Sequence, residues 1–472
     1  VTVEFRLAKD MPWAGKGYVQ MEEQLLVKAA EAHPALAETV KGQAPQLTEG
    51  ADMNTVKGEG FEVKFNNATG TIHSLNYGGQ TVIADGNGPV IDALRAPTDN
   101  DNWFYQQWFA NGLHNLRHKA IDHTVYTRKD GCIVLSYTVE SQAPCAGQIR
   151  GGSSGRYTIT DGRTFGPDDF KFTTNQIWTV YADGSIELES SISSNNPGLI
   201  LPRLGYALKA PKALNRYTYY GRGPVNNYND RKTGSFIAQY TSSVKDQFVN
   251  FPKPQSMGNR EDVRWCALTD NNGKGVQFIT TDRMSASALP WSALQLTLAP
   301  HPHELPESDG TYLHLDTKVT GLGGNSCGQG GPLVEDRVKA DAHQMGIIIR
   351  PATADLAAAA KVAPSGEMPL TITRDKAGNV TLVAAKAGMD ICYQMTENGK
   401  TAPRKGKKAQ APVYTEPFNL RNGGKVTAWY KDNPMLKTTT SFERIESIPV
   451  EVIFASSEET GGGRASNLVD NN

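Results

Sequence analysis

The sequence predicts an all-β fold dominated by a large β-sandwich. Short alternating or aromatic runs recur about every ten residues, for example at 61–65, 133–139 and 176–181. Turn sequences such as Asp183-Gly184 separate these runs, while long helical periodicity is nearly absent. Short strands at even spacing with turn signals between them are typical of β-sandwiches.

Composition shifts divide the chain, whose 472 residues suggest about three domains. Residues 29–57 are rich in Ala, Pro, Gly, Glu and Thr without apolar periodicity, and residues 352–366 are rich in Ala, so we expect a linker at each place. Between them the strand pattern is continuous over 58–351. A second set of short strands covers 367–445.

The two ends of the chain carry strand patterns of their own. Residues 1–28 open in the middle of a strand with Val-Thr-Val-Glu-Phe, and we expect them to belong to something larger. Residues 446–472 begin a further apolar strand and are too few to bury a core of their own.

Charge and cysteine content exclude several classes of protein. The net charge is −1, whereas a nucleic-acid-binding domain carries a basic face, so we expect no nucleic-acid partner. No apolar run approaches the ~18 residues that span a bilayer, so we expect no membrane partner. The five cysteines show no CxxC spacing, which argues against a zinc site or a disulfide framework. We expect no metal and no cofactor in this chain.

Two segments combine abrupt turns with crowded polar side chains. In the segment 215–231, Gly221, Gly223 and Pro224 force a change of backbone direction at the end of an aromatic strand. Asn, Tyr, Asp and Arg residues follow, and such side chains bind sugar hydroxyls or one another. The alternative is a turn whose polar network fixes only its own loop. The second segment is Arg95-Ala-Pro-Thr-Asp-Asn-Asp101.

Together, residues 94–101 and 220–231 resemble the signatures of the last core domain of the β-galactosidases of glycoside hydrolase family 2. Other segments follow in the order of that family: 70–75, 259–264 and 321–326. On this resemblance, residues 58–351 form a large galactose-mutarotase-like sandwich.

The resemblance extends more weakly to the rest of the chain. Residues 1–28 look like the tail of an immunoglobulin-like domain. Residues 367–445 are similar to a small immunoglobulin- or fibronectin-like sandwich, and 446–472 resemble the truncated start of a discoidin-type domain.

The family implies a retaining β-galactosidase that hydrolyses terminal β-galactosides. Retaining hydrolysis needs two carboxyl groups held ~5–5.5 Å apart, and the family mounts them on a (β/α)₈ barrel. This sequence has no alternating strand–helix repeats of that kind. The resemblance therefore implies a non-catalytic portion, inactive alone, whose partners are a galactoside or oligosaccharide and the enzyme's own upstream barrel. A periplasmic or extracellular location is expected.

The loop after Asp101 is the first candidate for substrate contact, because the matching loop of the family borders the active-site cleft. Asn102, Trp103 and Phe104 lie in it, and aromatic faces stack on the C–H faces of pyranoses. The alternative is that Trp103 and Trp108 anchor the loop in the core. We expect the Asp99-Asn-Asp101 cluster to brace this loop.

Tyr312 is the second candidate. The family commonly has tryptophan at the matching position, stacked on the leaving-group portion of the substrate. Tyrosine keeps an aromatic face, narrows it and adds a hydroxyl group, which puts the leaving-group preference in doubt. The alternative is a tyrosine that only packs beside its turn.

Two other functions remain open: a stand-alone sugar-binding or structural module, and an aldose-epimerase-like enzyme. The second rests on the superfold and on His301, His303 and Glu304 as acid and base, although fold alone does not imply activity. These three residues do not complete a zinc motif, because Glu307 stands where HExxH needs its second histidine. A loop of polar residues is the expected alternative.

Overall fold

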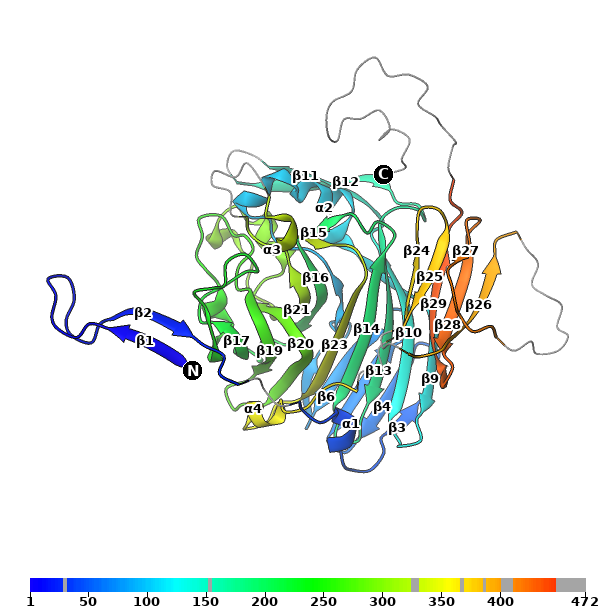
Figure 1. Cartoon of the computed structure of the whole chain (residues 1–472), viewed down its shortest axis with the longest axis horizontal. Coiled ribbons are helices and arrows are strands. Elements are labelled where there is room, and N and C mark those ends of the chain that lie inside the picture. Colours follow the sequence, from blue (N-terminus) through cyan, green and yellow to red (C-terminus); the bar gives the residue numbers. More distant parts are fainter. Residues whose placement is uncertain are drawn as a thin grey trace, which may run out of the picture.

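The computed structural model describes residues 1–28, 32–151, 155–323, 331–365, 369–384, 388–399 and 411–446. Strands dominate these ranges, and the longest helices, α2 (Tyr105–Ala110) and α3 (Ala293–Leu298), have six residues each (Figure 1). The predicted fold class, a large sandwich followed by a small β-sandwich, is confirmed.

A twelve-stranded antiparallel sheet forms the centre of the molecule. Its main path runs β18-β17-β19-β20-β23-β14-β13-β10-β9, while β8 pairs with β16, β16 with β21, and β21 with β20. The bounds of the strands are β8 (Val90–Asp92), β9 (Arg117–Thr127), β10 (Ile133–Gln142), β13 (Lys171–Val180), β14 (Ile186–Ser194), β16 (Arg203–Ala210), β17 (Arg216–Gly223), β18 (Phe236–Ser243), β19 (Arg260–Thr269), β20 (Gly275–Leu289), β21 (Thr311–Val319) and β23 (His343–Pro351).

A five-stranded sheet packs against this large sheet. It consists of β3 (Gln46–Thr48), β4 (Met53–Gly58), β5 (Phe61–Asn66), β6 (Thr71–Tyr77) and β7 (Gln80–Ile83). Alternate residues of β5 are buried, as its sequence pattern predicts. Phe65 meets Trp178 of β13 edge to face with ring centroids 5.6 Å apart, so the two sheets share one apolar core.

The prediction of a linker over 29–57 is partly wrong. Strands β3 and β4 lie within it, and Val56 is fully buried in the core. The apolar pattern there is weak because the buried Asn54 takes the place of an apolar residue and donates to the amide oxygen of Asn67 at 2.8 Å. Helix α1 (Leu36–Thr39) also buries Leu36 beside residues of the second expected linker, Ala360 and Val362, where α4 (Leu356–Ala359) lies.

Smaller elements gather at the two ends of the large sheet. Helices α2 and α3 lie at one end with the hairpin of β11 (Cys145–Gly151) and β12 (Tyr157–Thr164), whereas α1 and α4 lie at the other (Figure 1). The short strands β15 (Ile200–Leu201) and β22 (Val338–Lys339) pair with each other.

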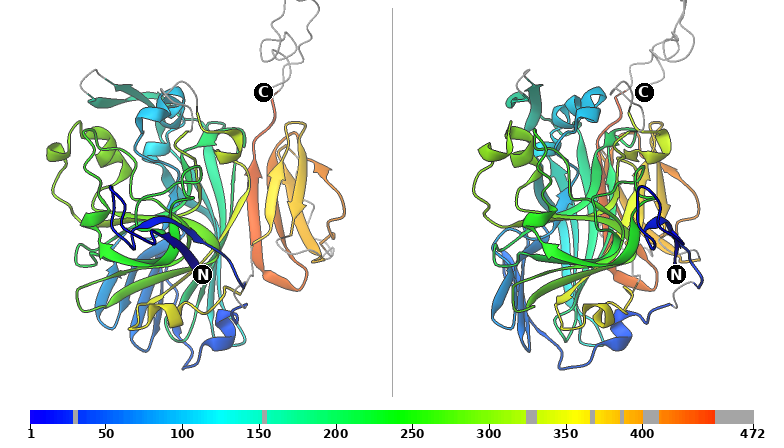
Figure 2. Two further views of the ribbon diagram at one scale, coloured as in Figure 1. Left: turned by 60° about the vertical axis from the view of Figure 1, so that its left-hand side comes forward. Right: turned by 90° about the vertical axis from the view of Figure 1, so that its left-hand side faces the viewer.

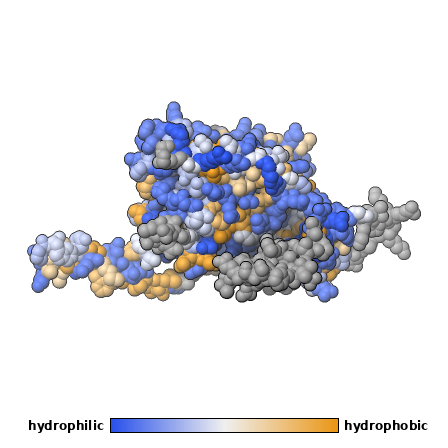
Figure 3. All heavy atoms as spheres, turned by 90° about the horizontal axis from the view of Figure 1, so that it is seen from above, coloured by the Kyte–Doolittle hydropathy of each residue, from blue (hydrophilic) through white to orange (hydrophobic). Residues whose placement is uncertain are grey.

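The N-terminal hairpin projects from the large sandwich. Strands β1 (Thr2–Arg6) and β2 (Val19–Gln24) pair antiparallel, and at the end of β2 the side chain of Gln24 exchanges hydrogen bonds with the backbone of Ile237. Apolar atoms run along this arm (Figure 3), including the exposed side chains of Phe5, Trp13 and Met21.

The small sandwich lies beside the large one (Figure 2). One of its sheets contains β24 (Thr371–Arg374), β25 (Asn379–Val383) and β27 (Phe418–Asn419), and the other β26 (Ile391–Glu397), β28 (Gly424–Tyr430) and β29 (Asn433–Phe442). Leu436 of β29 packs with Val134 and Ile177 of the large sheet. The expected discoidin-type start, from residue 447 onward, lies outside the described residues.

No helix in the described ranges has the length and apolar character needed to cross a membrane. Among the described cysteines, four are free thiols: Cys132, Cys145, Cys266 and Cys392.

Candidate functional site

A buried ion pair fixes the loop that follows residue 98. Nε of Arg95 lies 3.1 Å from Oδ2 of Asp101, and Nη2 lies 2.5 Å from Oδ1. Both residues are buried, each with 1 % of its surface exposed. Asp101 also accepts from the backbone N–H and the hydroxyl of Thr98, which closes the first turn of the 3₁₀ helix at Asp99–Trp103. Asp101 therefore braces the loop from below.

The aromatic residues of the loop divide into an anchor and a surface pair. Trp108 is 1 % exposed, donates from Nε1 to the Ile200 carbonyl at 3.2 Å and carries Arg95 above its ring. Trp103 and Phe104 are half-buried, with ring centroids 4.7 Å apart. Trp108 thus lies in the core, as the alternative for this loop expects of both tryptophans, whereas Trp103 is only half-buried.

The indole of Trp103 packs between Gly331 and the side chain of Arg337. The guanidinium of Arg337 is 5.1 Å from its ring centroid, and a Cβ on Gly331 would meet the indole at 2.2 Å, so only glycine fits there. The buried indole Nε1 has no hydrogen-bond partner among the described residues. The neighbouring Asn102 is exposed. At this loop a half-buried indole and an exposed amide side chain are therefore neighbours in sequence.

Tyr312 lies at the start of β21, opposite Lys209 of β16. Its hydroxyl donates to Oδ1 of Asp309 at 2.9 Å, and Nζ of Lys209 lies 5.9 Å from the ring centroid. Burial, and then the Asp309 carboxylate, raise the pKa of Tyr312 to about 12. Tyr312 therefore stays a neutral phenol with a half-buried ring.

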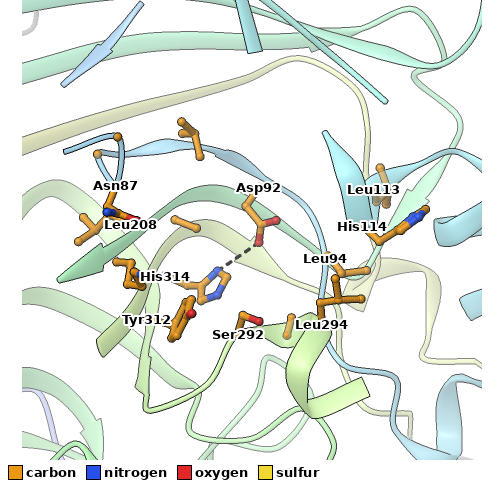
Figure 4. A pocket seen from close by; sticks show the side chains of 16 residues that line it. Asn87, Asp92, Leu94, Leu113, His114, Leu208, Ser292, Leu294, Tyr312 and His314 are labelled. Carbon is orange, nitrogen blue, oxygen red and sulfur yellow. Dashed lines mark ion pairs between the residues drawn. The ribbon is translucent and has the colours of Figure 1, made fainter. Parts of the chain in front are cut away.

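The ring of Tyr312 borders a cavity of about 280 Å³ (Figure 4). Strands β8, β16 and β21 supply one wall, and the start of α3 and the segment at Leu113 and His114 supply the other. Inside it, His314 lies two residues after Tyr312 on the same face of β21. Its Nδ1 is 3.2 Å from Oδ2 of Asp92.

Charges behind the cavity wall hold Asp92 ionised. Burial by itself raises the pKa of Asp92, but His314 and Arg203 outweigh burial, so this pKa lies below its usual value. Arg203 is itself held by Asp316, whose Oδ1 is 3.1 Å from Nε. Behind Asp92, Arg203 and Asp316 thus form a buried ion pair.

Side chains of the polar turn at 220–231 form hydrogen bonds within the turn and to the segment at 322–323, and no residue of this turn lines the cavity. Asn227 donates to the carbonyl oxygens of Arg222 and Val225, and Asp230 accepts from the backbone N–H groups of Leu322 and Gly323. Of the two alternatives for this turn, the described contacts favour a structural network.

His301, His303 and Glu304 form an exposed cluster away from these contacts. One ligand atom from each lies within 4.8 Å of the others, close enough to share a metal ion. In the structure, Glu304 binds Nδ1 of His301 at 2.8 Å and Nη2 of Arg156 at 2.7 Å. Both carboxylate oxygens are therefore already engaged.

Sequence reasoning missed Asp92 and His314. The alternation of β21 places His314 on the face of Tyr312, which is a usable signal once that strand is assigned. Nothing in the local sequence connects Asp92 to it, because the contact depends on the pairing of β8, β16 and β21.

Comparison with known proteins gives consistent matches. Residues 57–349 match the family model described as the β-galactosidase small chain. The β-galactosidase of Priestia megaterium is 30% identical over 335 residues, which cover 70% of this chain and 29% of that protein. The β-galactosidase of Lactobacillus delbrueckii subsp. bulgaricus is 30% identical over 332 residues, or 68% of this chain and 29% of that protein. This chain thus spans less than a third of the length of these relatives.

Solved structures align at low similarity. The galactose 1-epimerase from Lactobacillus acidophilus NCFM has a TM-score of 0.35 and 9% identity, covering 65% of this chain and 97% of that one. A galactose mutarotase related enzyme from Lactobacillus acidophilus has a TM-score of 0.33 and 10% identity, covering 66% and 97%.

Proposed function

Because the chain belongs to the family of β-galactosidase small chains, we propose that it is the C-terminal, non-catalytic portion of a retaining β-galactosidase. The membership confirms the resemblance carried by residues 94–101 and 220–231. In the proposal, this portion completes an active-site cleft whose two catalytic carboxyl groups lie on an upstream barrel, and the substrate is a terminal β-galactoside.

The position of the aromatic side chains is the observation that carries the proposal. Trp103 and Tyr312 are half-buried, while the Arg95–Asp101 pair and the buried Trp108 anchor the loop of Trp103. Rigid aromatic faces suit the stacking of pyranose C–H groups at low cost in conformational entropy. Asn102 and Phe104 belong to the same proposed binding surface.

The absence of a barrel among the described residues supports a non-catalytic role. A (β/α)₈ barrel needs eight strand–helix units, whereas the helices in the described ranges do not exceed six residues. In the proposed enzyme this chain binds and orients the leaving group, and proton transfer and nucleophilic attack occur at carboxyl groups outside it.

A reconstitution experiment tests this function. The 472-residue chain, the upstream part of the same enzyme and an equimolar mixture are assayed with a nitrophenyl β-galactoside. We expect hydrolysis by the mixture and by the fused enzyme, and none by this chain alone. Hydrolysis by this chain alone would contradict the proposal, as would full activity of the upstream part without it.

A stand-alone carbohydrate-binding module is the second candidate, and the cavity beside Tyr312 favours it. Binding of galactose or lactose by the isolated chain separates it from a purely structural module. An aldose-epimerase-like activity has less support, because Glu304 is engaged by His301 and Arg156 at the surface. Mutarotation of an aldose by the isolated chain would support the epimerase-like activity. A periplasmic or extracellular location remains a prediction.

A further inference from the structure

Four backbone carbonyl oxygens surround the ammonium group of Lys253. Its Nζ donates to the oxygens of Pro254 and Leu296 at 3.1 Å and to those of Thr297 and Ala299 at 2.8 Å. Three of these oxygens belong to the end of α3 and the residue after it, where a helix leaves carbonyl groups without partners of its own. A cation at this end also interacts favourably with the helix dipole. Lys253 therefore ties the end of α3 to its own segment of the chain.

The ring of Tyr157 completes the surroundings of this ammonium group. Nζ of Lys253 lies 5.3 Å from the ring centroid, a distance at which a cation and an aromatic face attract each other. Burial lowers the pKa of Lys253 to about 8, against the opposing charge of Asp99. At pH 7 the amine therefore stays mostly protonated, and this form has three N–H donors to share among the oxygens.

The start of the loop of Trp103 rests on the segment that follows Lys253. The carbonyl oxygen of Ala96 accepts from the backbone N–H of Ser256 at 3.0 Å. Ala96 also packs in one apolar cluster with Leu296 of α3. Lys253 holds both partners of Ala96, because it binds the carbonyl groups of α3 and lies three residues before Ser256 in the chain.

The end of the same loop rests on the hairpin of β11 and β12. Tyr105, the first residue of α2, meets the ring of Tyr157 in β12 edge to face, with ring centroids 5.6 Å apart. Tyr157 is also the residue whose ring faces the ammonium group of Lys253. One lysine side chain thus contacts the supports of both ends of the loop.

We propose that Lys253 is a positioning residue for the loop of Trp103, whose ammonium group joins α3, the segment at 254–257 and the hairpin of β12 into one support for both ends of that loop. The proposal rests on the proposed function in one respect, because an effect on substrate binding follows only if this loop contacts substrate. The support itself is a property of this chain and is measured without the parent enzyme.

Chemical rescue tests the ammonium group directly. The n-propylammonium ion has the size and charge of the part of the side chain that Lys253→Ala removes. We expect Lys253→Ala to lower the Tm of the 472-residue chain by ~5 °C at pH 7, and n-propylammonium chloride at ~50 mM to restore most of this loss. Tetramethylammonium chloride at the same concentration carries the charge without an N–H donor and should restore none.

Two further variants control the rescue. Lys212 is an exposed lysine in a surface ion pair with Glu307, so Lys212→Ala should keep its Tm and respond to neither ion. Lys253→Met keeps an unbranched side chain without the ammonium group, so it should lose stability and show no rescue, and its Tm decides the matter where Lys253→Ala does not fold. A Lys253→Met chain with the wild-type Tm overturns the proposal, and so does a Lys253→Ala chain that gains equally from both ions.

Hydrogen exchange, followed by mass spectrometry of short peptides, shows whether the support reaches the loop. The backbone N–H of Phe104 donates to the carbonyl oxygen of Asp101 at 2.9 Å, so its exchange reports on the order of the loop. In Lys253→Ala we expect peptides with Phe104 and with Ala299 to exchange about tenfold faster, and n-propylammonium to slow both again. A peptide with Ile237, whose N–H is bonded to Gln24, should keep its wild-type rate. An equal increase in all three peptides means general destabilisation and overturns the positioning role.

The parent enzyme separates this inference from the proposed function. Lys253→Ala should raise KM for a galactosyl-glucose disaccharide severalfold with little change in kcat, and n-propylammonium should restore KM. If exchange responds as expected and KM does not change, Lys253 positions the loop and the substrate role of Trp103 is wrong. If the reconstituted enzyme is active while neither Tm nor exchange responds to n-propylammonium, the positioning role is wrong and the proposed function stands.

Discussion

The guanidinium of Arg95 and the carboxylate of Asp101 form a two-point ion pair beneath the aromatic loop, with N–O distances of 2.5 and 3.1 Å. Arg95 also donates to the carbonyl oxygens of Thr320 and Gly321. The pair therefore joins the loop of Trp103 to the end of β21, the strand that carries Tyr312. Tyr312 lies at the opposite end of that strand, so the ion pair supports the loop of Trp103 alone.

Removing Asp101 should destabilise the chain strongly. Asp101→Ala leaves the buried guanidinium of Arg95 without its counter-charge, which costs ~3–5 kcal/mol. The free energy of unfolding in urea measures this loss. Asp99→Ala is the matched control, because Asp99 is exposed and a surface substitution changes stability by less than ~0.5 kcal/mol. Equal losses in the two variants would contradict the bracing role.

The two tryptophans of the loop should respond in opposite ways. Trp108→Ala empties a core position and should cost ~3–5 kcal/mol of stability. Trp103→Ala should cost ~1 kcal/mol, since its ring is only half-buried, yet it should raise KM of the parent enzyme for oligosaccharides severalfold. Urea denaturation and steady-state kinetics measure the two effects. An unchanged KM in Trp103→Ala would assign Trp103 to loop packing alone.

Tyr312→Ala should weaken leaving-group discrimination in the parent enzyme. The ratio of kcat/KM between a disaccharide and a nitrophenyl galactoside should fall by about tenfold, which corresponds to ~1.4 kcal/mol of lost stacking, while the hydrolytic chemistry remains. Tyr312→Phe keeps the ring, loses the bond to Asp309 and should retain most of the discrimination. An unchanged preference among leaving groups in the alanine variant would refute the cleft role.

His118 should make stability fall on the acidic side of neutrality. Burial, together with the nearby Arg117, outweighs the opposing charge of Asp92 and lowers the pKa of His118 to about 4. Its Nδ1 lies 2.9 Å from Oγ of Ser141. Between about pH 6.5 and about pH 4 the unfolded chain binds a proton that the folded chain does not, so stability declines as pH falls through this window.

The expected loss is ~3 kcal/mol when pH falls from about 7 to about 4. His118→Gln removes this titration, and its free energy of unfolding should decline less over the same range. The difference between the wild-type and variant pH profiles measures the contribution, because the other titrating groups act in both. Parallel profiles would show that His118 titrates normally in the folded chain.

Much of the fold follows from local alternation. In β5 (Phe61–Asn66) the residues alternate between buried and half-buried, and an alternating pattern of this kind specifies both the strand and its inner face. Strand β3 was not predicted because it has only three residues. Strand β4 was not predicted because one of its inward positions holds Asn54, a polar residue whose burial is offset by the hydrogen bond to Asn67. A tertiary hydrogen bond of this kind leaves no trace in a hydropathy pattern.

The sequence indicates candidate residues of the site, but it does not reveal the cavity. Trp103 and Tyr312 stand next to recognisable motifs, so their positions follow from the resemblance. The cavity and the Asp92–His314 contact depend on strand pairing between distant segments. Such a hollow depends on which residues face one another across three strands, and sequence order does not supply that information.

A crystal structure of the parent enzyme, trapped with an unhydrolysed galactosyl disaccharide by replacement of its catalytic nucleophile, tests the central claim most directly. The account predicts that ring atoms of Tyr312 lie within about 4.5 Å of the leaving-group sugar, with Trp103 at the same cleft. A substrate bound with no atom of this chain in contact would contradict the claim that this portion completes the cleft.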